Sequence, residues 1–368
     1  MKYFLYGYFG FNNFGDDLLL EKLLKNIKKR DKKAFFYIRN KEKIDFLKNE
    51  NNIELTCLES IIYTDSNIFY KLFSYLKKSF NYINKSDIFV IGPGGLFLDK
   101  GKVNKSIIVL YLLVKYASFK NKKIVIVGTS FDIIANPFNL FLLKKIFLLS
   151  SFISVRDSIS YAYLKYMNIP NIVKSYDLVF LDIENKVFSV DMLKKKKRAT
   201  IGLCFTDYYK DYEEDEIKRK KFLSKILKLV NLLQDNYNLT YISLQEDNEV
   251  RDDVIYDFLI SKNIKIEYIN LNMKNHKSFF DNYEVILTMR YHLALLGFIE
   301  NKHIVIIDHE IKMSSLKLDF DIQSISIDDF IETSSVEKVR KMIEIRERSK
   351  MDIDNYIKKS LENFKWLK

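Results

Sequence analysis

The chain has 368 residues, and we expect two domains, because a single hydrophobic core rarely grows to this size. Apolar residues make up 48% of it, as in globular proteins, and no uncharged apolar run reaches about 18 residues, which excludes a membrane-spanning helix. The net charge of +12 suits an anionic substrate or membrane surface, whereas scattered lysines without zinc-finger spacing argue against a nucleic-acid partner.

The two cysteines, Cys57 and Cys204, lie far apart and near strand patterns. They predict small buried side chains of a reducing compartment, and no disulfide. The apolar start of the chain is brief and soon reaches Asp16 and Asp17, so the N-terminus does not have the pattern of a cleavable signal. We therefore expect a cytoplasmic protein.

In the first half of the chain, strand patterns alternate with helix patterns. Apolar residues at helical spacing predict a helix over Phe69–Ile83. The predicted strands are Tyr3–Tyr8, Ala34–Ile38, Ile53–Cys57, Asp87–Ile91, Lys123–Val127 and Phe152–Val155. This order indicates a parallel, doubly wound α/β sheet, whose ligands bind beyond the carboxyl ends of the strands.

Two glycine-rich loops follow strands of this half. The first runs from Gly7 to Asp17 and the second from Gly92 to Gly95, and together they hold six of the ten glycines. The first loop does not match the dinucleotide fingerprint, and Asp16 with Asp17 would repel a phosphate at the start of the following helix. It favours a neutral sugar, although a glycine-rich turn with Asp capping the helix explains the pattern equally well.

The strand Phe152–Val155 ends in Arg156, which we expect to point out of the strand end. The next residues, Asp157 and Ser158, are candidate caps of the helix that follows. The strand end would therefore offer a guanidinium to a ligand.

A basic run, Lys194–Arg198, interrupts the alternation and is typical of a linker. We expect domains over 1–190 and 199–335, followed by a C-terminal helical segment over 336–368. A long helix is predicted over Glu213–Tyr237. The strands predicted in the second domain are Thr200–Phe205, Leu239–Leu244, Ile264–Tyr268, Glu284–Leu287 and His303–Ile307.

Arg290 and His292 stand between a predicted strand and a predicted helix. Residues two apart in extended chain point the same way, and a helix N-terminus adds N–H donors, so the pair suits an anionic substrate and a proton transfer. An isolated Arg-x-His pair is more often an arginine binding carbonyls and a histidine packed under a loop. His309 and Lys312 follow the next strand and are expected to reach the same cleft. The four histidines do not have metal-ligand spacing, so we predict no metal site.

Taken in order, these segments resemble the polysaccharide pyruvyl transferase family. Its motifs are matched by Gly7–Asp17, Gly92–Gly95 with Asp99, Ser154–Asp157 with Ser160, Asp177–Phe180, Met289–His292 and Lys312. The chain departs from the family's pattern at Asn12, at Pro93 and after Gly128. In addition, Asn301–His303 stands where the family has a Gly-x-Pro turn. The first three differences fall in first-domain loops, so they concern the acceptor more than the donor.

The resemblance implies two Rossmann-like domains facing across a cleft, as in the GT-B fold. It implies transfer from phosphoenolpyruvate to a sugar of a bacterial cell-surface polysaccharide or its precursor, which leaves a pyruvate ketal and phosphate without a cofactor. The acceptor would be a sugar or a lipid-linked oligosaccharide. His292 and Arg290 would be catalytic. Donor-binding residues would be Arg156, Arg290, Lys312 and His309. We place the acceptor at Asn13, Asp16, Asp17, Gly94 and Gly95.

Two other functions fit the same fold. One is a GT-B glycosyltransferase that uses a nucleotide sugar, although the second domain offers no convincing acidic ribose-binding position. The other is a non-catalytic glycan-assembly protein, against which Arg290 and His292 argue. A peripheral contact with the inner membrane face is a further hypothesis, from the basic amphipathic segments Phe69–Lys85 and Phe138–Leu149. Packing of both segments on the sheet explains the pattern better.

Overall fold

The computed structural model describes residues 1–40, 44–47, 50–56, 68–97, 101–185, 198–210, 215–244, 252–276, 278–345 and 352–367. The chain forms two compact α/β units. Unit 1 comprises Met1–Phe11, Asp16–Asp182 and Ile353–Lys368, and unit 2 comprises Asn12–Gly15 and Ile183–Asp352. Asp99, Cys57 and Lys194–Lys197 of the predicted linker lie outside the described residues.

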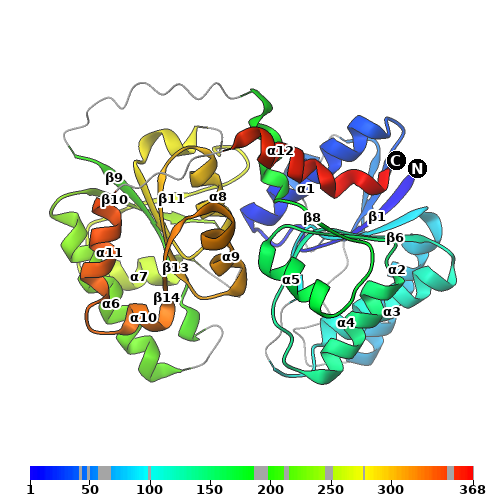
Figure 1. Cartoon of the computed structure of the whole chain (residues 1–368), viewed down its shortest axis with the longest axis horizontal. Coiled ribbons are helices and arrows are strands. Elements are labelled where there is room, and N and C mark those ends of the chain that lie inside the picture. Colours follow the sequence, from blue (N-terminus) through cyan, green and yellow to red (C-terminus); the bar gives the residue numbers. More distant parts are fainter. Residues whose placement is uncertain are drawn as a thin grey trace. The chain divides into compact units, whose positions relative to one another are not determined.

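Unit 1 is built on a parallel sheet in the order β3-β2-β1-β4-β6-β7-β8, with β5 paired to β6 (Figure 1). Its strands are β1 (Lys2–Tyr6), β2 (Phe35–Ile38), β3 (Ile53–Leu55), β4 (Ile88–Ile91), β5 (Gly94–Phe97), β6 (Lys123–Phe131), β7 (Phe152–Val155) and β8 (Ile172–Lys174). The strands read as apolar runs because both faces of the sheet are covered. The doubly wound prediction is confirmed for this unit.

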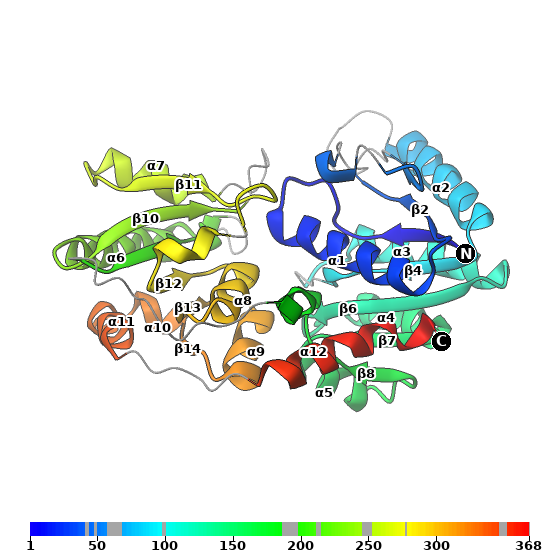
Figure 2. The ribbon, with the colours of Figure 1, turned by 90° about the horizontal axis from the view of Figure 1, so that it is seen from above.

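The helices of unit 1 divide between the two faces of this sheet (Figures 1 and 2). Four helices pack on one face of the sheet, and each contributes a buried side chain to the core there: Tyr75, Leu113, Phe147 and Leu164. These helices are α2 (Ile68–Lys85), α3 (Lys105–Phe119), α4 (Pro137–Leu149) and α5 (Ser158–Tyr166). The other face is covered by α1 (Phe14–Arg30) and by the C-terminal α12 (Ile353–Leu361) and η5 (Glu362–Leu367). Short 3-10 helices are η1 (Asp45–Leu47) and η2 (Leu178–Asn185).

Strand β6 continues four residues past its predicted end at Val127. Gly128 has a φ of +59°, and the pairing with β7 passes from Ile126–Ile153 to Thr129–Val155, so β6 contains one extra residue. Such a bulge bends a strand without ending it. The glycine that predicted a strand end therefore marks a bulge.

Unit 2 is a second parallel sheet, in the order β11-β10-β9-β12-β13-β14. Its strands are β9 (Thr200–Cys204), β10 (Asn238–Ser243), β11 (Glu267–Asn270), β12 (Val285–Thr288), β13 (His303–Asp308) and β14 (Gln323–Ser326). Its helices are α6 (Glu216–Gln234), α7 (Asp253–Ser261), η4 (Phe279–Asn282), α8 (Tyr291–Ile299), α9 (Ile311–Phe320), α10 (Ile327–Ile331) and α11 (Ser335–Glu344). Strand β11 starts later than predicted, because Glu267 pairs with Thr240 while Ile264 packs into the core.

The predicted C-terminal segment over 336–368 does not stand apart. Its first helix, α11, buries Val339 and Ile343 in the core of unit 2. Its last part returns to unit 1, where Asn363 is fully buried. The Asn363 Oδ1 accepts hydrogen bonds from the hydroxyls of Ser154 (2.7 Å) and Ser175 (2.9 Å). Charged residues dominate this part of the sequence, so helical spacing alone did not reveal which core it would join.

Candidate functional site

The strand-to-helix junction after β12 holds Arg290 against a buried carboxylate. The Arg290 Nε donates to Oδ1 of Asp252 at 2.7 Å, and its terminal Nη2 contacts the same oxygen. Asp252 is fully buried, and its other oxygen accepts the Leu244 N–H at 3.0 Å. The Arg290 side chain keeps 18% of its surface exposed. One edge of the guanidinium is thus fixed while part of the side chain reaches solvent.

The backbone at this junction is also fixed. The Arg290 N–H donates to the Thr288 Oγ1 at 2.8 Å, and Arg290 immediately precedes the first residue of α8. Arg290 is therefore the N-cap residue of α8, and the backbone N–H groups at such a helix start favour an anion. The sequence did not reveal Asp252, because an aspartate before a helix looks like an ordinary cap, and here its side chain makes no cap hydrogen bond.

His292, in the first turn of α8, lies against the segment Asn12–Gly15 of unit 2. A Cβ added to Gly15 would come within 2.0 Å of the His292 Nδ1, so this close approach requires glycine. The same segment is attached by the Phe14 N–H, which donates to the Leu244 carbonyl at 3.1 Å. The end of the glycine-rich opening and the Met289–His292 segment are therefore neighbours in the fold.

Asn13 caps the helix that follows it. Its Oδ1 accepts the Gly15 N–H at 3.0 Å, which caps the N-terminus of α1. Asp16 and Asp17, the predicted caps, lie within the first turn of the helix instead. Asn13 thus helps to hold Gly15 where it meets His292.

The end of β13 carries a compact set of charges. Lys312 pairs with Glu310, whose Oε1 lies 3.5 Å from the His309 Nε2. Burial would raise the pKa of the Glu310 carboxyl, but the Lys312 ammonium and His309 hold that pKa well below its usual range. Lys312 and His309 both contact Glu310, and the Lys312 side chain remains 25% exposed.

In unit 1, Asp16 and Asp17 lie at the carboxyl edge of the sheet. The Gly10 N–H donates to the Asp17 Oδ1 at 3.2 Å, and burial raises the pKa of Asp17 to about 6. The Asp16 Oδ1 would lie 3.0 Å from a Cβ on Gly94, which has a φ of +111°. A Cβ on Gly95 would have nothing within 4 Å. The structure therefore brings the two glycine-rich loops together at one edge.

Arg156 does not point out of its strand end as expected. It is 2% exposed; its Nη1 binds Asp177 Oδ2 at 2.6 Å and its Nε donates to the Ser130 hydroxyl at 2.6 Å. A buried guanidinium needs such partners, since it would otherwise lose its hydration without compensation. Asp157, by contrast, caps α5 as predicted, accepting the Ser160 N–H at 2.7 Å.

Arg39 is a further cation at the carboxyl edge of the unit 1 sheet, and the sequence did not predict it as a site residue. It follows β2, its guanidinium lies 4.7 Å from the centre of the Tyr6 ring, and its Nη1 donates to the Gly7 carbonyl at 3.0 Å. Within the described residues, no carboxylate is paired with it. The sequence signal that could have identified Arg39 is its position directly after the predicted strand Ala34–Ile38, because ligands bind beyond the carboxyl ends of parallel strands.

Comparison with known proteins decides the family. The model of the family described as "Polysaccharide pyruvyl transferase" matches residues 13–311, a range that includes Gly15, Arg290 and His292. The chain belongs to this family. It is therefore a transferase, and its acceptor is a sugar or glycan. No curated protein sequence matches the chain significantly.

Solved structures share the fold of this pyruvyl transferase family member at low identity. The UDP-GlcNAc 2-epimerase from Methanocaldococcus jannaschii is 14% identical, with a TM-score of 0.60 over 100% of this chain and 99% of that one. A putative UDP-N-acetylglucosamine 2-epimerase from Listeria monocytogenes is 10% identical, with a TM-score of 0.60 over 97% and 91%. MurG from Acinetobacter baumannii is 9% identical, with a TM-score of 0.52 over 99% and 94%. The two Rossmann-like units are thus of the GT-B class.

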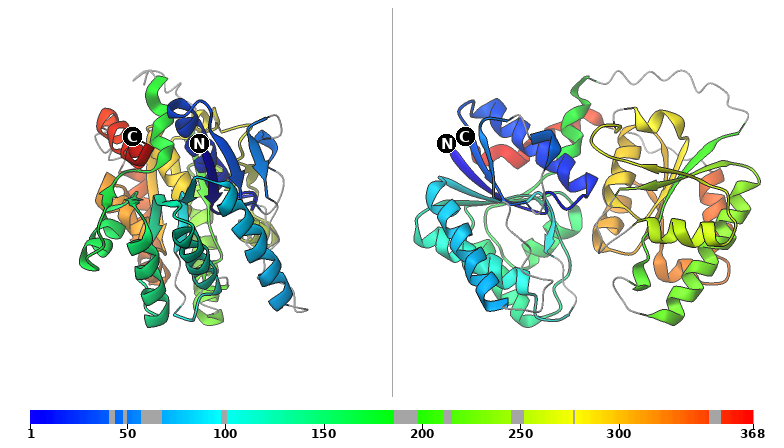
Figure 3. Two further views of the ribbon diagram at one scale, coloured as in Figure 1. Left: turned by 90° about the vertical axis from the view of Figure 1, so that its right-hand side faces the viewer. Right: turned by 180° about the vertical axis from the view of Figure 1, so that it is seen from behind.

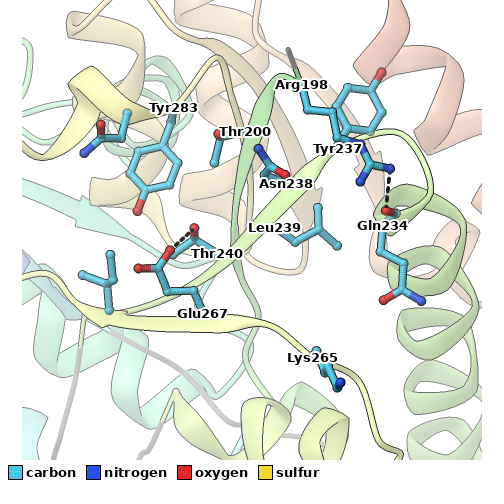
Figure 4. A pocket seen from close by; sticks show the side chains of 12 residues that line it. Arg198, Thr200, Gln234, Tyr237, Asn238, Leu239, Thr240, Lys265, Glu267 and Tyr283 are labelled. Carbon is cyan, nitrogen blue, oxygen red and sulfur yellow. Dashed lines mark hydrogen bonds between the residues drawn. The ribbon is translucent and has the colours of Figure 1, made fainter. Parts of the chain in front are cut away.

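A polar cavity of about 710 Å³ in unit 2 is separate from the predicted site residues (Figure 4). It lies at the first residues of β9 and β10 and beside β11, away from the carboxyl edge of the sheet. Thr240 and Glu267 are hydrogen-bonded there at 3.3 Å. Among the described residues, no group of three His, Cys, Asp or Glu side chains is arranged to hold a metal ion.

Proposed function

We propose that this pyruvyl transferase family member moves pyruvate from phosphoenolpyruvate to two hydroxyls of one sugar, as a ketal. The observation that carries the proposal is the Arg290 side chain, which starts at the N-cap of α8 and has its guanidinium fixed by Asp252. Phosphoenolpyruvate has a carboxylate and a phosphate, and a guanidinium binds such groups in a planar fork. Positive charge and backbone N–H groups at one strand end support binding of this anionic donor in unit 2.

Lys312 and His309 would complete the donor site in this proposal. Glu310 lies between them and keeps the set nearly neutral, so an arriving phosphate would compete with Glu310 for the ammonium. The Lys312 side chain is exposed enough to turn towards a ligand. Arg156 would act only indirectly, since it is 2% exposed and paired with Asp177 inside unit 1, whereas Arg290 keeps 18% of its side chain exposed beside its own aspartate.

The reaction needs a proton at the methylene carbon of the donor. One sugar hydroxyl adds to the central carbon while that carbon's methylene neighbour becomes a methyl group. A second hydroxyl then replaces the phosphate, which leaves as inorganic phosphate. We assign the proton delivery to His292, because an imidazole changes charge near neutral pH and such catalysis contributes about 10²–10⁴ in rate.

The acceptor side of the proposal rests on unit 1. Carboxylates and open backbone at glycines hydrogen-bond sugar hydroxyls, and Asp16, Asp17 and Gly95 offer both at one sheet edge. With its pKa raised to about 6, Asp17 is ionised at neutral pH yet basic enough to accept a hydroxyl proton. We therefore propose Asp17 as the group that activates the acceptor.

Heat protection tests the donor assignment. A ligand that binds only the folded protein raises its melting temperature, so phosphoenolpyruvate should stabilise the chain and a nucleotide sugar such as UDP-GlcNAc should not. Arg290→Lys should remove the protection, while Arg219→Lys should keep it. Arg219 is the matched control, because it is paired with buried Asp207 in the same unit. Protection by UDP-GlcNAc alone would instead support the glycosyltransferase alternative.

A further inference from the structure

Helix α4 exposes an apolar surface that the core of unit 1 does not use. Leu142, Leu143, Ile146 and Phe147 face the core, which explains why the segment is amphipathic. The opposite side, here named the α4 face, consists of Phe138, Phe141, Lys144, Lys145, Leu148 and Leu149. Packing on the sheet accounts for only one side of this helix.

The exposure of the α4 face is large. Phe141 is 56% exposed, Leu148 49% and Phe138 47%. Single exposed apolar residues are ordinary, but several on one helix side mark a surface that binds something. Lys144 and Lys145 are exposed between them, with the Lys145 Nζ 5.5 Å from the centre of the Phe141 ring. The face therefore combines apolar side chains with positive charge.

The neighbouring helices extend this surface. Phe80 of α2 stacks on Tyr116 of α3 at 4.1 Å, and the Asn104 N–H before α3 donates to the Asn139 side chain of α4 at 3.0 Å. The three helices thus lie side by side on one face of the sheet (Figures 1 and 3). Phe73 of α2 and Phe119 of α3 are 67% and 76% exposed. Lys77, Lys78, Lys115 and Lys120 are exposed beside them.

The charge of these helices identifies the partner. The sequences of α2, α3 and α4 contain lysines but not one Asp or Glu, although the chain as a whole has 48 acidic residues. A two-fold interface in which this face meets its own copy would place lysine against lysine. A bilayer with anionic headgroups accepts both features, since apolar side chains enter the headgroup layer and lysines remain at its surface.

We propose that unit 1 docks on an anionic membrane surface through the α4 face, with α2 and α3 beside it. None of the described helices is long and apolar enough to cross a membrane, so the contact is peripheral. The proposed contact does not depend on the chemistry assigned to the family, and it uses the side of α4 that does not pack on the sheet.

Vesicle sedimentation of the full chain tests the proposal. The chain should sediment with phosphatidylglycerol vesicles at low salt, be released at high salt, and stay in the supernatant with phosphatidylcholine vesicles. Phe141→Glu with Leu148→Glu should lower binding at least about tenfold, because both side chains leave the headgroup layer. Lys144→Gln with Lys145→Gln should lower it roughly 30-fold through lost charge.

The matched control changes two exposed apolar residues of unit 2 in the same way. Ile217 and Leu318 are 74% and 68% exposed, so Ile217→Glu with Leu318→Glu should sediment like the parent chain. Phe141 and Leu148 of the test variant, like Ile217 and Leu318 of the control, are exposed, so both variants are expected to fold. A parent chain that stays in the supernatant, or a Phe141→Glu/Leu148→Glu variant that sediments normally, overturns the proposal. A dimer without lipid that this variant converts to monomer also overturns it, because the face then binds a second copy.

Discussion

Gly15 and His292 are in direct contact, with room for no more than a hydrogen on the glycine α-carbon. A Cβ at position 15 would lie 2.0 Å from the imidazole Nδ1. These residues are separated by most of the chain, yet both lie in the range that matches the pyruvyl transferase family, in segments that resemble its motifs. The contact gives one physical reason for a glycine in the opening motif: it sets the position of the histidine proposed to move the proton.

Gly15→Ala should therefore displace the imidazole and lower turnover. A shift of about 1 Å in a catalytic group can cost roughly 100-fold in rate, so we expect a loss of that order in kcat with little change in donor affinity. Phosphate release from phosphoenolpyruvate in the presence of a glycan acceptor measures the effect. In a His292→Ala background the same change should have almost no further effect, because the two residues act through one contact. Additive losses would show that Gly15 acts elsewhere.

Asp252→Asn should weaken donor binding without abolishing the fold. The amide has a single oxygen, which can accept from Arg290 or from the Leu244 N–H but not from both, and the charge that aligns the guanidinium is gone, so we expect roughly tenfold weaker binding of phosphoenolpyruvate. Titration calorimetry measures the affinity.

The control for Asp252 is Asp207→Asn, which alters a similar pair with Arg219 in the same unit. It should leave donor affinity unchanged. Equal losses in both variants would mean that the effect comes from general weakening of unit 2 and not from the placement of Arg290.

The sequence predicted most of the fold because parallel sheets produce strong local signals. The apolar run Val285–Leu287 and the helix that starts after Arg290 were both found, since each is periodic over its own length. β5, β8 and β14 were missed. They are short, and β5 is defined by its pairing with β6 rather than by its own composition. Local patterns cannot predict such pairing.

The candidate site was only partly accessible to sequence reasoning. Arg290 and His292 were found because they follow a strand, whereas Asp252 and Gly15 join them through contacts between distant segments. Arg156 follows a strand in the same way and is nevertheless buried against Asp177. A residue's place at a strand end therefore predicts proximity to the site, but its neighbours in space decide whether it can meet a ligand.

Asn363→Ala should destabilise unit 1. Its side chain accepts from Ser154 and Ser175 and donates to the Tyr176 carbonyl at 2.8 Å, all in buried surroundings. Leaving these partners unsatisfied should cost about 2–4 kcal/mol of unfolding free energy, measured by urea denaturation. Lys365→Ala in the same 3-10 helix is the control, because that side chain is 47% exposed and should change stability by less than about 0.5 kcal/mol. A similar small change for Asn363→Ala would show that the C-terminal return adds little to unit 1.

The last prediction concerns the pH dependence that Asp17 should confer on stability. Burial raises its pKa from 3.8 to about 6 in the folded chain, so between these values the folded state holds a proton that the unfolded state has lost. Stability therefore falls as pH rises from about 4 to about 6, and the burial of an ionised Asp17 costs roughly 3 kcal/mol at neutral pH. Asp17→Asn removes the titration. Compared with the parent, it should be about equally stable near pH 4 and more stable near pH 7.5, while the loss of the proposed base lowers turnover. Urea denaturation at both pH values, beside phosphate-release assays, separates the two effects. If the stability difference between parent and variant is the same at both pH values, Asp17 does not titrate as argued, and its role as the base for the acceptor is lost with it.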